Sequence, residues 1–211
     1  MDDRIIVNKK NMAKANWVKT DKAYGSGNAT VNVSSNADHT GRNARTTILT
    51  WKGANVEDAP ATVAQAGKPE FVDIDDAAAA ESTGKVVTIS GVSNSARLAF
   101  SLGTGNLDIV LPSTYIANSL TVANGAAING DPGALAEYPF SIKVTVPANP
   151  GTSDLSRQII VSDDAGHQDV CLLTLAGGEP YIIITPTLIE LDYKGTPVAV
   201  QVKSNTSWTI E

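Results

Sequence analysis

Very few residues of this chain are of a type that could do chemistry, and none stands in a pattern that a reaction requires. His39 and His167, the two histidines, each lie near acidic residues in a stretch rich in Gly, Asn and Asp. A His–Asp pair invites an acid–base or metal-binding interpretation, but no second His or Cys stands at ligand spacing. We therefore predict that both histidines are solvated turn residues.

The carboxylates and the single thiol give no stronger signal. The segments DIDDA (73–77) and DDAGHQD (163–169) are rich in oxygen ligands, but neither has the spacing of a calcium-binding loop, so both are predicted to be turns. Cys171 lies in the alternating apolar run DVCLLTL and is predicted to be buried. The sequence shows no Ser-His-Asp order, no phosphate-binding loop and no dinucleotide fingerprint. We expect no enzymatic activity, no cofactor and no metal.

Composition excludes several classes of partner. The 211 residues carry a formal net charge of -6 and no basic block, so nucleic acid is not an expected partner, because phosphate binding needs clustered Lys and Arg. No apolar run approaches the roughly 18 residues of a membrane-spanning helix, so no membrane contact is expected. The stretch MDDRIIVNKKNMAKANW (1–17) has neither the apolar core of a signal peptide nor a lipidated cysteine. We expect a protein that is made and kept in a cytoplasm, or assembled there into something larger.

Short strands dominate the predicted secondary structure. Aromatic residues make up only 5% of the chain, and the predicted strands are rich in β-branched residues and bounded by Gly, Asn, Asp or Pro. Many short strands at close spacing predict an all-β fold of tandem immunoglobulin-like β-sandwich modules. Helical turns are predicted only within 75–83 and 131–138, where Pro132 could start one. The predicted strands are 29–33, 46–51, 61–66, 70–74, 85–90, 97–102, 107–111, 119–123, 140–146, 157–163, 169–175, 181–186, 188–193, 198–203 and 208–210.

An internal repeat organises these strands. Pro69 precedes Gly84 by 15 residues, as Pro180 precedes Gly195, and each glycine is followed at the same spacing by a Ser-Asn pair, at 93–94 and 204–205. We name this segment the front half of a module. A second segment, the back half, recurs at an offset of about 110 to 113 residues: VNVSSN, Arg45 and ATVAQAG are matched by VTVPAN, Arg157 and LLTLAGG.

The repeat predicts one complete module between two incomplete ones. Residues 1–68 form a back half without a front, residues 69–178 form a complete sandwich, and residues 179–211 form a front half without a back. A lone half would expose an apolar face and unpaired strand edges, so each half is expected to complete another module. The completing partner could be a second copy or another virion protein, or the same chain could close on itself. Alternatively, the chain could be a piece of a longer array, or the repeat could have a different phase.

The motifs resemble those of BACON domains, immunoglobulin-like modules common in Bacteroidetes proteins. VKSNTSW (202–208) matches the first part of the family pattern, and YGSGNATVNVSSN (24–36), Arg45 and TVAQAG (62–67) match the second. The central module departs from the pattern, since Arg97 stands where the tryptophan would fall and the stretch 114–138 resembles an insertion. The family name implies carbohydrate binding, and a spacer role is equally compatible. Such modules are also familiar from phages that infect Bacteroides, including crAss-like phages.

Two functions follow as expectations. The first is a non-enzymatic virion protein, a capsid auxiliary or decoration protein whose partners are copies of itself and other virion proteins. The second is a carbohydrate-binding module that adheres to glycans. Trp17, Trp51 and Trp208 are predicted to lie in module cores, whereas Tyr115 and Tyr138 are the best candidates for an exposed surface that binds sugar or protein. The residues expected at the interface of the C-terminal half are Val198, Val200, Val202, Trp208 and Ile210.

Overall fold

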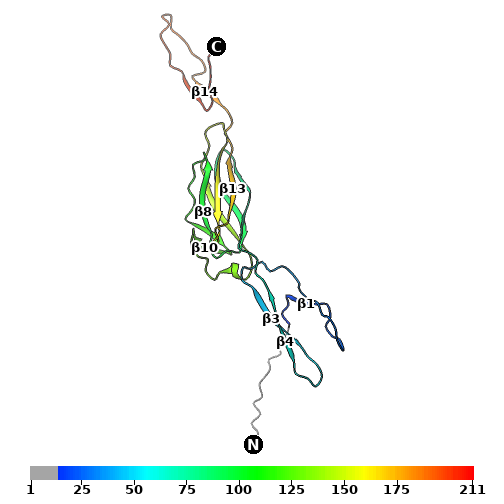
Figure 1. Cartoon of the computed structure of the whole chain (residues 1–211). Helices are drawn as coiled ribbons and strands as arrows, with labels where there is room; N and C mark the ends of the chain where they lie inside the picture. The colour runs from blue at the N-terminus through cyan, green and yellow to red at the C-terminus, as the bar shows by residue number, and fades with distance from the viewer. Residues whose placement is uncertain (1–13) are drawn as a thin grey trace. The chain divides into compact units, whose positions relative to one another are not determined.

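The computed structural model describes residues 14–211 and confirms the all-β prediction (Figure 1). Its described residues contain fifteen short strands, one 3-10 turn (η1, Pro132–Ala134) and no α-helix. The chain divides after Pro69 into two compact units. The expectation that the extreme N-terminus lacks an apolar leader falls mostly on residues 1–13, outside the described part.

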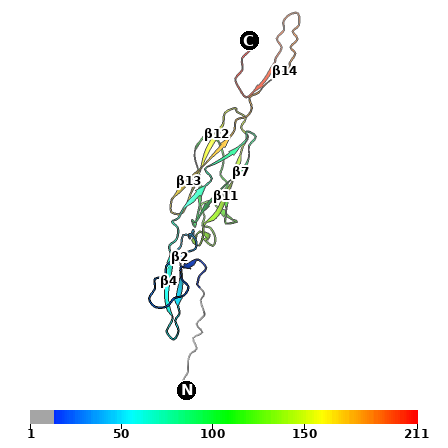
Figure 2. The same ribbon diagram turned by 90° about the vertical axis from the view of Figure 1, so that its right-hand side faces the viewer.

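The second unit contains a complete immunoglobulin-like sandwich of two sheets. Figure 2 shows β12 and β13 in one layer and β7 and β11 in the other. All pairings are antiparallel except that of β6 with β13, which is parallel. In sheet order, the first layer is β10 (Leu120–Ala123), β9 (Thr114–Ala117), β11 (Tyr138–Val146), β7 (Lys85–Ser93) and β5 (Val72–Ile74), and the second is β6 (Ala77–Ala80), β13 (Gln168–Leu175), β12 (Leu155–Ser162) and β8 (Ala99–Gly105).

Period-2 patterning places the core between these layers. Alternate residues of β11, from Tyr138 to Val146, are buried, as strand geometry requires for a sheet with one covered face. The ring of Phe100 lies 5.1 Å from that of Tyr115 and 5.9 Å from that of Phe140, centroid to centroid. This core is continuous from Ile74 to Leu175 and includes Cys171, whose predicted burial is confirmed.

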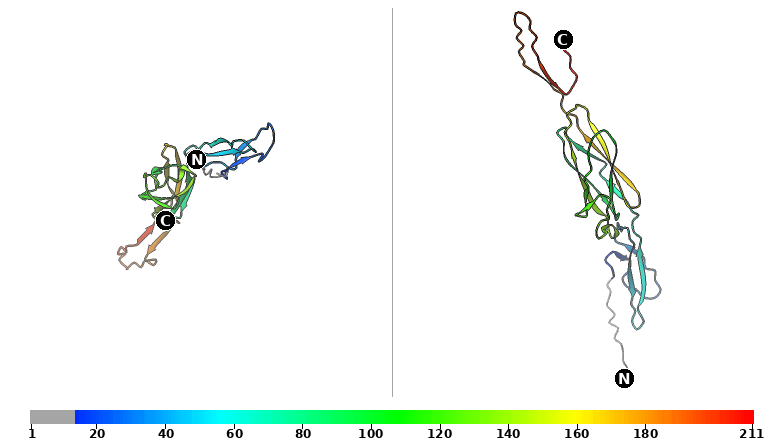
Figure 3. Two further views of the ribbon diagram at one scale, coloured as in Figure 1. Left: turned by 90° about the horizontal axis from the view of Figure 1, so that it is seen from below. Right: turned by 90° about the vertical axis from the view of Figure 1, so that its left-hand side faces the viewer.

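The N-terminal unit has four described strands but little core. Strands β1 (Val18–Thr20) and β2 (Val33–Ser35) form one two-stranded sheet, and β3 (Arg45–Trp51) and β4 (Ala59–Gln65) form another. The long β3–β4 hairpin is the cyan ribbon of Figure 3. Among the described residues of this unit, Val18 and Leu49 are its buried large hydrophobic side chains. Two sheets of two strands are too few to enclose a larger apolar interior.

The C-terminal stretch forms a hairpin of its own. Strand β14 (Ile182–Thr185) pairs with β15 (Gln201–Ser204) in a two-stranded sheet. No residue from 181 to 211 is classed as buried. The hairpin therefore presents apolar side chains that the sequence pattern assigns to a core.

Several predicted elements differ from the observed ones. Residues 77–80, predicted as part of a helical turn, form strand β6, because their small side chains pair along the edge of β13. Residues 107–111 are not a strand, although Leu107 and Ile109 are buried. Segments 188–193 and 208–210 are also not strands, because no neighbouring strand supplies their ladder hydrogen bonds. Strands β1 and β9 were not predicted.

Candidate functional site

The C-terminal hairpin repeats the register of the front strands of the sandwich. In the sandwich, β5 pairs with β7 so that Val72 lies opposite Ser93. In the hairpin, β14 pairs with β15 so that Ile182 lies opposite Ser204. The repeat seen in the sequence therefore extends to strand pairing.

The Ser-Asn pairs perform the same function in both places. In the pair Ser93–Asn94, the asparagine oxygen accepts a hydrogen bond of 3.0 Å from the N–H of Phe71, and the serine hydroxyl donates one of 2.7 Å to its carbonyl. In the pair Ser204–Asn205, the same two bonds to Tyr181 are both 2.9 Å long. Each pair ties the start of a front half to the end of its last strand.

The two front halves differ in what lies against them. Gly84 and Gly195 occupy equivalent turns, with φ of +71° and +69°. A Cβ atom on Gly84 would lie 2.5 Å from the carbonyl oxygen of Val146 and 2.6 Å from Pro147, both in the back half of the sandwich. A Cβ atom on Gly195 would meet nothing within 4 Å. The C-terminal front half lacks the back half that covers its counterpart.

Apolar side chains are exposed as a result. Ile184 is 44% exposed, whereas Ile74, its counterpart in the sandwich, is 2% exposed. Contiguous exposed apolar side chains are a common feature of surfaces that bind other proteins. The exposed apolar residues of this hairpin, drawn in orange to red in Figure 3, are Tyr181, Ile182, Ile183, Ile184, Leu188, Ile189, Leu191, Tyr193, Val198, Trp208 and Ile210.

The N-terminal unit repeats the back strands in the same way. Strands β3 and β4 pair so that Arg45 lies opposite Gln65. Strands β12 and β13 pair so that Leu155 lies opposite Leu175. Both residues of this second pair stand 110 positions after those of the first pair. The register thus aligns Arg45 with Leu155, and the alignment of Arg45 with Arg157 expected from the sequence is wrong by two residues.

Glycines after these hairpins confirm the 110-residue shift. A Cβ atom on Gly67 would collide with the carbonyl of Arg42, and one on Gly177 would collide with the carbonyl of Thr152. The residue after each glycine donates its backbone N–H to the carbonyl of a loop glycine. Lys68 donates to Gly41 at 2.9 Å, and Gly178 donates to Gly151 at 2.7 Å. Both loops need glycine for the close approach of two backbone segments.

An open groove lies in the N-terminal unit beside β3. It has a volume of about 710 Å³ and is lined on its apolar side by Val31, Ile48 and Trp51, with three lysines, Lys14, Lys22 and Lys52, around it. Trp51 is 44% exposed. The groove and the C-terminal hairpin are two separate candidate interaction surfaces, one in each unit. The chemistry that each offers is apolar contact and strand pairing.

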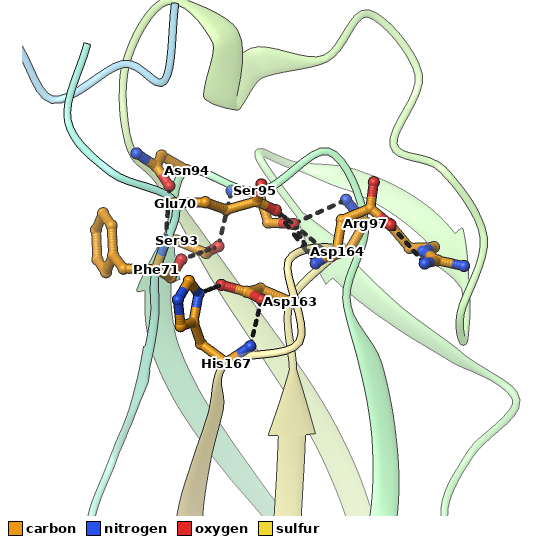
Figure 4. A network of polar contacts seen from close by, with 9 residues as sticks. All are labelled: Glu70, Phe71, Ser93, Asn94, Ser95, Arg97, Asp163, Asp164 and His167. Carbon is orange, nitrogen blue, oxygen red and sulfur yellow. Dashed lines mark hydrogen bonds and ion pairs between the residues drawn. The ribbon is translucent and has the colours of Figure 1, made fainter.

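A network of polar side chains lies at one end of the sandwich (Figure 4). His167 Nδ1 lies 2.7 Å from Asp163 Oδ2, and the His167 N–H donates to Asp163 Oδ1 at 2.8 Å. Asp163 is buried. The pair closes the turn between β12 and β13.

Neither nearby serine completes a hydrolytic triad with this pair. Such a triad requires a serine hydroxyl hydrogen-bonded to the imidazole. Ser95 Oγ instead lies 2.5 Å from Glu70 Oε1 and 2.7 Å from the Arg97 carbonyl, and it accepts a bond from the N–H of Asp164 at 3.0 Å. The network ties the first residue of the sandwich to two of its loops. The sequence shows the segments that contain these residues, but it could not show that Ser95 and Asp164, about 70 positions apart, lie in contact.

Burial governs the titration of two core groups. It raises the pKa of the Cys171 thiol from 9.0 to about 11, with the carboxylates of Asp75, Asp169 and Asp76 adding to the shift. It also raises the pKa of Tyr115. Cys171 is therefore a protonated, inert core side chain at neutral pH.

Predictions about the aromatic residues need correction. Tyr115 and Tyr138 are buried, and their hydroxyls bond to backbone groups of Leu98 and Ser95, so the prediction that they form an exposed binding surface is wrong. Both residues stand at core-facing positions of strands β9 and β11, which explains their burial.

The tryptophans are less buried than predicted. Trp208 is 47% exposed and Trp51 is similar, because the half-module that would enclose each is not packed on it. Trp17 is half-buried, with the Arg45 guanidinium 4.6 Å from the ring centroid.

Of the remaining residues predicted at the interface, only Val202 lies in a strand, β15. Val200 and Val202 are half-buried, while Val198 and Ile210 are exposed. Both histidines lie in turns: His39 Nε2 is 2.6 Å from the Asn43 carbonyl and is half-buried.

No family model matches the sequence, and no curated protein matches it. Within residues 14–211, no helix has the length and apolarity to cross a membrane. The same residues contain no group of three or more His, Cys, Asp or Glu side chains arranged to hold a metal ion.

Proposed function

We propose that this protein is a non-enzymatic structural protein of a virion, a capsid auxiliary or decoration protein that bridges neighbouring subunits by strand complementation. The observation that carries the proposal is the presence, in one chain, of a front half with an uncovered apolar face and a back half with an open groove. The resemblance of the motifs to modules of Bacteroides-infecting, crAss-like phages supports the assignment to a virion.

Strand complementation has a clear physical driving force. Enclosing each large apolar side chain of the hairpin stabilises the contact by about 1.5–3 kcal/mol, and a half-exposed side chain gains part of that amount. New ladder hydrogen bonds fix the register of the docked strands. A contact between two different surfaces of the same protein is heterologous, and it produces a ring or an open array. Both suit a protein that holds subunits together.

Self-association is the first test. We would measure mass by light scattering after size-exclusion chromatography over a wide concentration range, for the full chain and for a chain truncated after Pro180. The proposal expects the full chain to self-associate and the truncated chain to stay monomeric. A full chain that stays monomeric and loses stability on truncation would show that the hairpin closes its own N-terminal unit, which contradicts bridging.

The virion assignment needs a separate measurement. We expect antibodies against this chain to label intact phage particles purified from cultures that encode it, and peptide mass spectrometry to find the chain in those particles. A chain found only outside particles, and retained on glycan arrays, would favour the carbohydrate-binding function.

A further inference from the structure

The sandwich shows how a front half docks on a back half. Strand β6 lies parallel to β13 at the edge of its sheet, with Ala78 beside Leu173 and Ala80 beside Leu175. The two leucines and Ala80 are buried, and Ala78 is half-buried, so these side chains face the core. This contact is a template for joining the two separate halves.

The front-half segment that matches β6 can be located from its turn. Gly84 donates its N–H to the carbonyl of Glu81, and Gly195 donates to the carbonyl of Asp192, at 2.9 and 3.0 Å. Counting back from these turns, residues 188–191 correspond to β6. This is the segment predicted to be a strand and found without a partner strand.

The back-half segment that matches β13 follows from the 110-residue shift. Residues 172–175 of β13, which contact β6, correspond to 62–65 of β4. Transferring the register of the sandwich places Thr62 beside Leu188 and Ala64 beside Glu190 on the outer face. On the inner face it places Val63 beside Ile189 and Gln65 beside Leu191.

Side-chain size favours this pairing over docking on a β13-type strand. The C-terminal segment has Ile189 and Leu191 where β6 has two alanines. On a strand with two leucines at the facing positions, these larger side chains would overpack the core, which costs about 1–3 kcal/mol. Strand β4 has the smaller Val63 opposite Ile189, so the added bulk of Ile189 is partly offset there, and it has Gln65 opposite Leu191.

Charge favours the same partner. Residues 179–211 contain four acidic and two basic residues, for a net charge of -2, and the sandwich, 70–178, contains twelve acidic and four basic residues, for a net charge of -8. The described N-terminal unit, 14–69, contains four acidic and seven basic residues, for a net charge of +3. The acidic hairpin is attracted to this unit and repelled by a sandwich, which sets the choice of partner.

The path of the chain through the sandwich favours a second copy. The chain enters at Glu70, whose carboxylate accepts a hydrogen bond from Asp164 in the turn before β13, and leaves after Leu175, the last residue of β13. The eight residues of β13 span about 26 Å. The six residues 176–181 reach only about 20 Å. The hairpin therefore begins at the end of the sandwich opposite to the end at which residue 70 enters.

We infer that the C-terminal half completes the N-terminal unit of a second copy of this chain, with Leu188–Leu191 parallel to β4 and Leu191 beside Gln65. This inference rests on the proposed bridging function and gives it a partner, a strand and a register. It makes the interface a composite immunoglobulin-like sandwich whose front half and back half come from different copies.

Disulfide cross-linking between separately prepared full-length variants tests the register. Residues paired across neighbouring strands bring their Cα atoms within the range that a disulfide accepts, whereas residues displaced by two positions lie beyond it. We would mix Thr62→Cys with Leu188→Cys, and Ala64→Cys with Glu190→Cys, as matched pairs. The mismatched controls are Thr62→Cys with Glu190→Cys, and Ala64→Cys with Leu188→Cys. All four sites are exposed, and the unsubstituted chain controls for buried Cys171.

We expect a disulfide-linked dimer from both matched mixtures and loss of that band in both mismatched ones. If the chain self-associates by light scattering but the matched mixtures give no more dimer than the mismatched ones, the register is wrong while the bridging function stands. If Thr62→Cys and Leu188→Cys in one chain form a monomeric disulfide at high dilution, the same chain closes and the inference is overturned. A chain that does not associate at all overturns the bridging function as well.

Discussion

At the scale of single residues, equivalent residues of the sandwich and of the C-terminal hairpin make equivalent local contacts in different surroundings. Asn94 and Asn205 accept hydrogen bonds from equivalent backbone N–H groups, and Gly84 and Gly195 have nearly equal φ angles. Only the first of each pair is packed against a back half. These residue pairs therefore separate the local function of a side chain from the effect of the core around it, and they provide matched controls within one chain.

Cys171 predicts a loss of stability in alkaline solution. Because its pKa is raised from 9.0 to about 11 in the folded state, the protonated thiol favours folding fully below pH 9, and this contribution is lost as pH rises to 11. We expect the free energy of unfolding to fall by up to about 3 kcal/mol across that window. Urea unfolding of the native chain and of Cys171→Ala from pH 8 to 11.5 checks this. Parallel pH curves for the two proteins would contradict it.

The asparagine pair predicts a difference between the sandwich and the hairpin. In Asn94→Ala the buried N–H of Phe71 loses its acceptor, so we expect the sandwich to lose about 1–3 kcal/mol of unfolding free energy. In Asn205→Ala the corresponding bond belongs to the exposed hairpin, so the main unfolding transition should not change. Calorimetry of both variants at low concentration, where the chain is expected to be monomeric, measures the stability of the sandwich in each. Equal losses would mean that hairpin and sandwich unfold as one unit.

At the scale of elements, the sequence predicted two of the hairpins well but missed β9, although it pairs with the neighbouring strand β10. The hairpins β12–β13 and β3–β4 show alternation and turn residues, so their strands were placed within two residues. Ala77–Ala80 was misassigned because a run of alanines has no strand signal, and its partner β13 lies about 95 residues away. The stretch 188–193 was predicted as a strand because its alternation suits one, but strand structure also needs a partner.

The two turn glycines predict unequal effects of one substitution. Both residues have positive φ, so an alanine costs about 1 kcal/mol at either site for backbone strain. At Gly84 the new Cβ also collides with Val146 and Pro147, so Gly84→Ala should lower the melting temperature of the sandwich markedly. Gly195→Ala should leave that melting temperature unchanged and weaken self-association, because the second copy would occupy the space beside it. Thermal melts and light scattering measure both. Undiminished self-association of Gly195→Ala would contradict packing at this turn.

At the scale of the whole molecule, the chain combines a sandwich that has an extensive buried core with flanking segments, 14–69 and 179–211, that bury few apolar side chains. The core of the sandwich contains no residue of the N-terminal unit or of the C-terminal hairpin, so assembly through these two segments need not disturb it. The candidate site was predictable from the sequence because the repeat shows which strands each half lacks. Its groove, its lysines and the exposure of Trp51 required the structure, because they arise from contacts between segments that are distant in the sequence.

A charge placed in the proposed interface should separate assembly from folding. Leu191 is 62% exposed and is predicted to become buried beside Gln65 of a second copy, so Leu191→Asp would bury a carboxylate without a partner. We expect this variant to lose self-association by light scattering while the sandwich keeps its melting temperature. Val110→Asp is the matched control, since Val110 is 84% exposed on the sandwich and lies outside both half-modules. If both variants associate as the native chain does, Leu191 does not lie in the interface; if Val110→Asp alone prevents association, the copies meet through the sandwich.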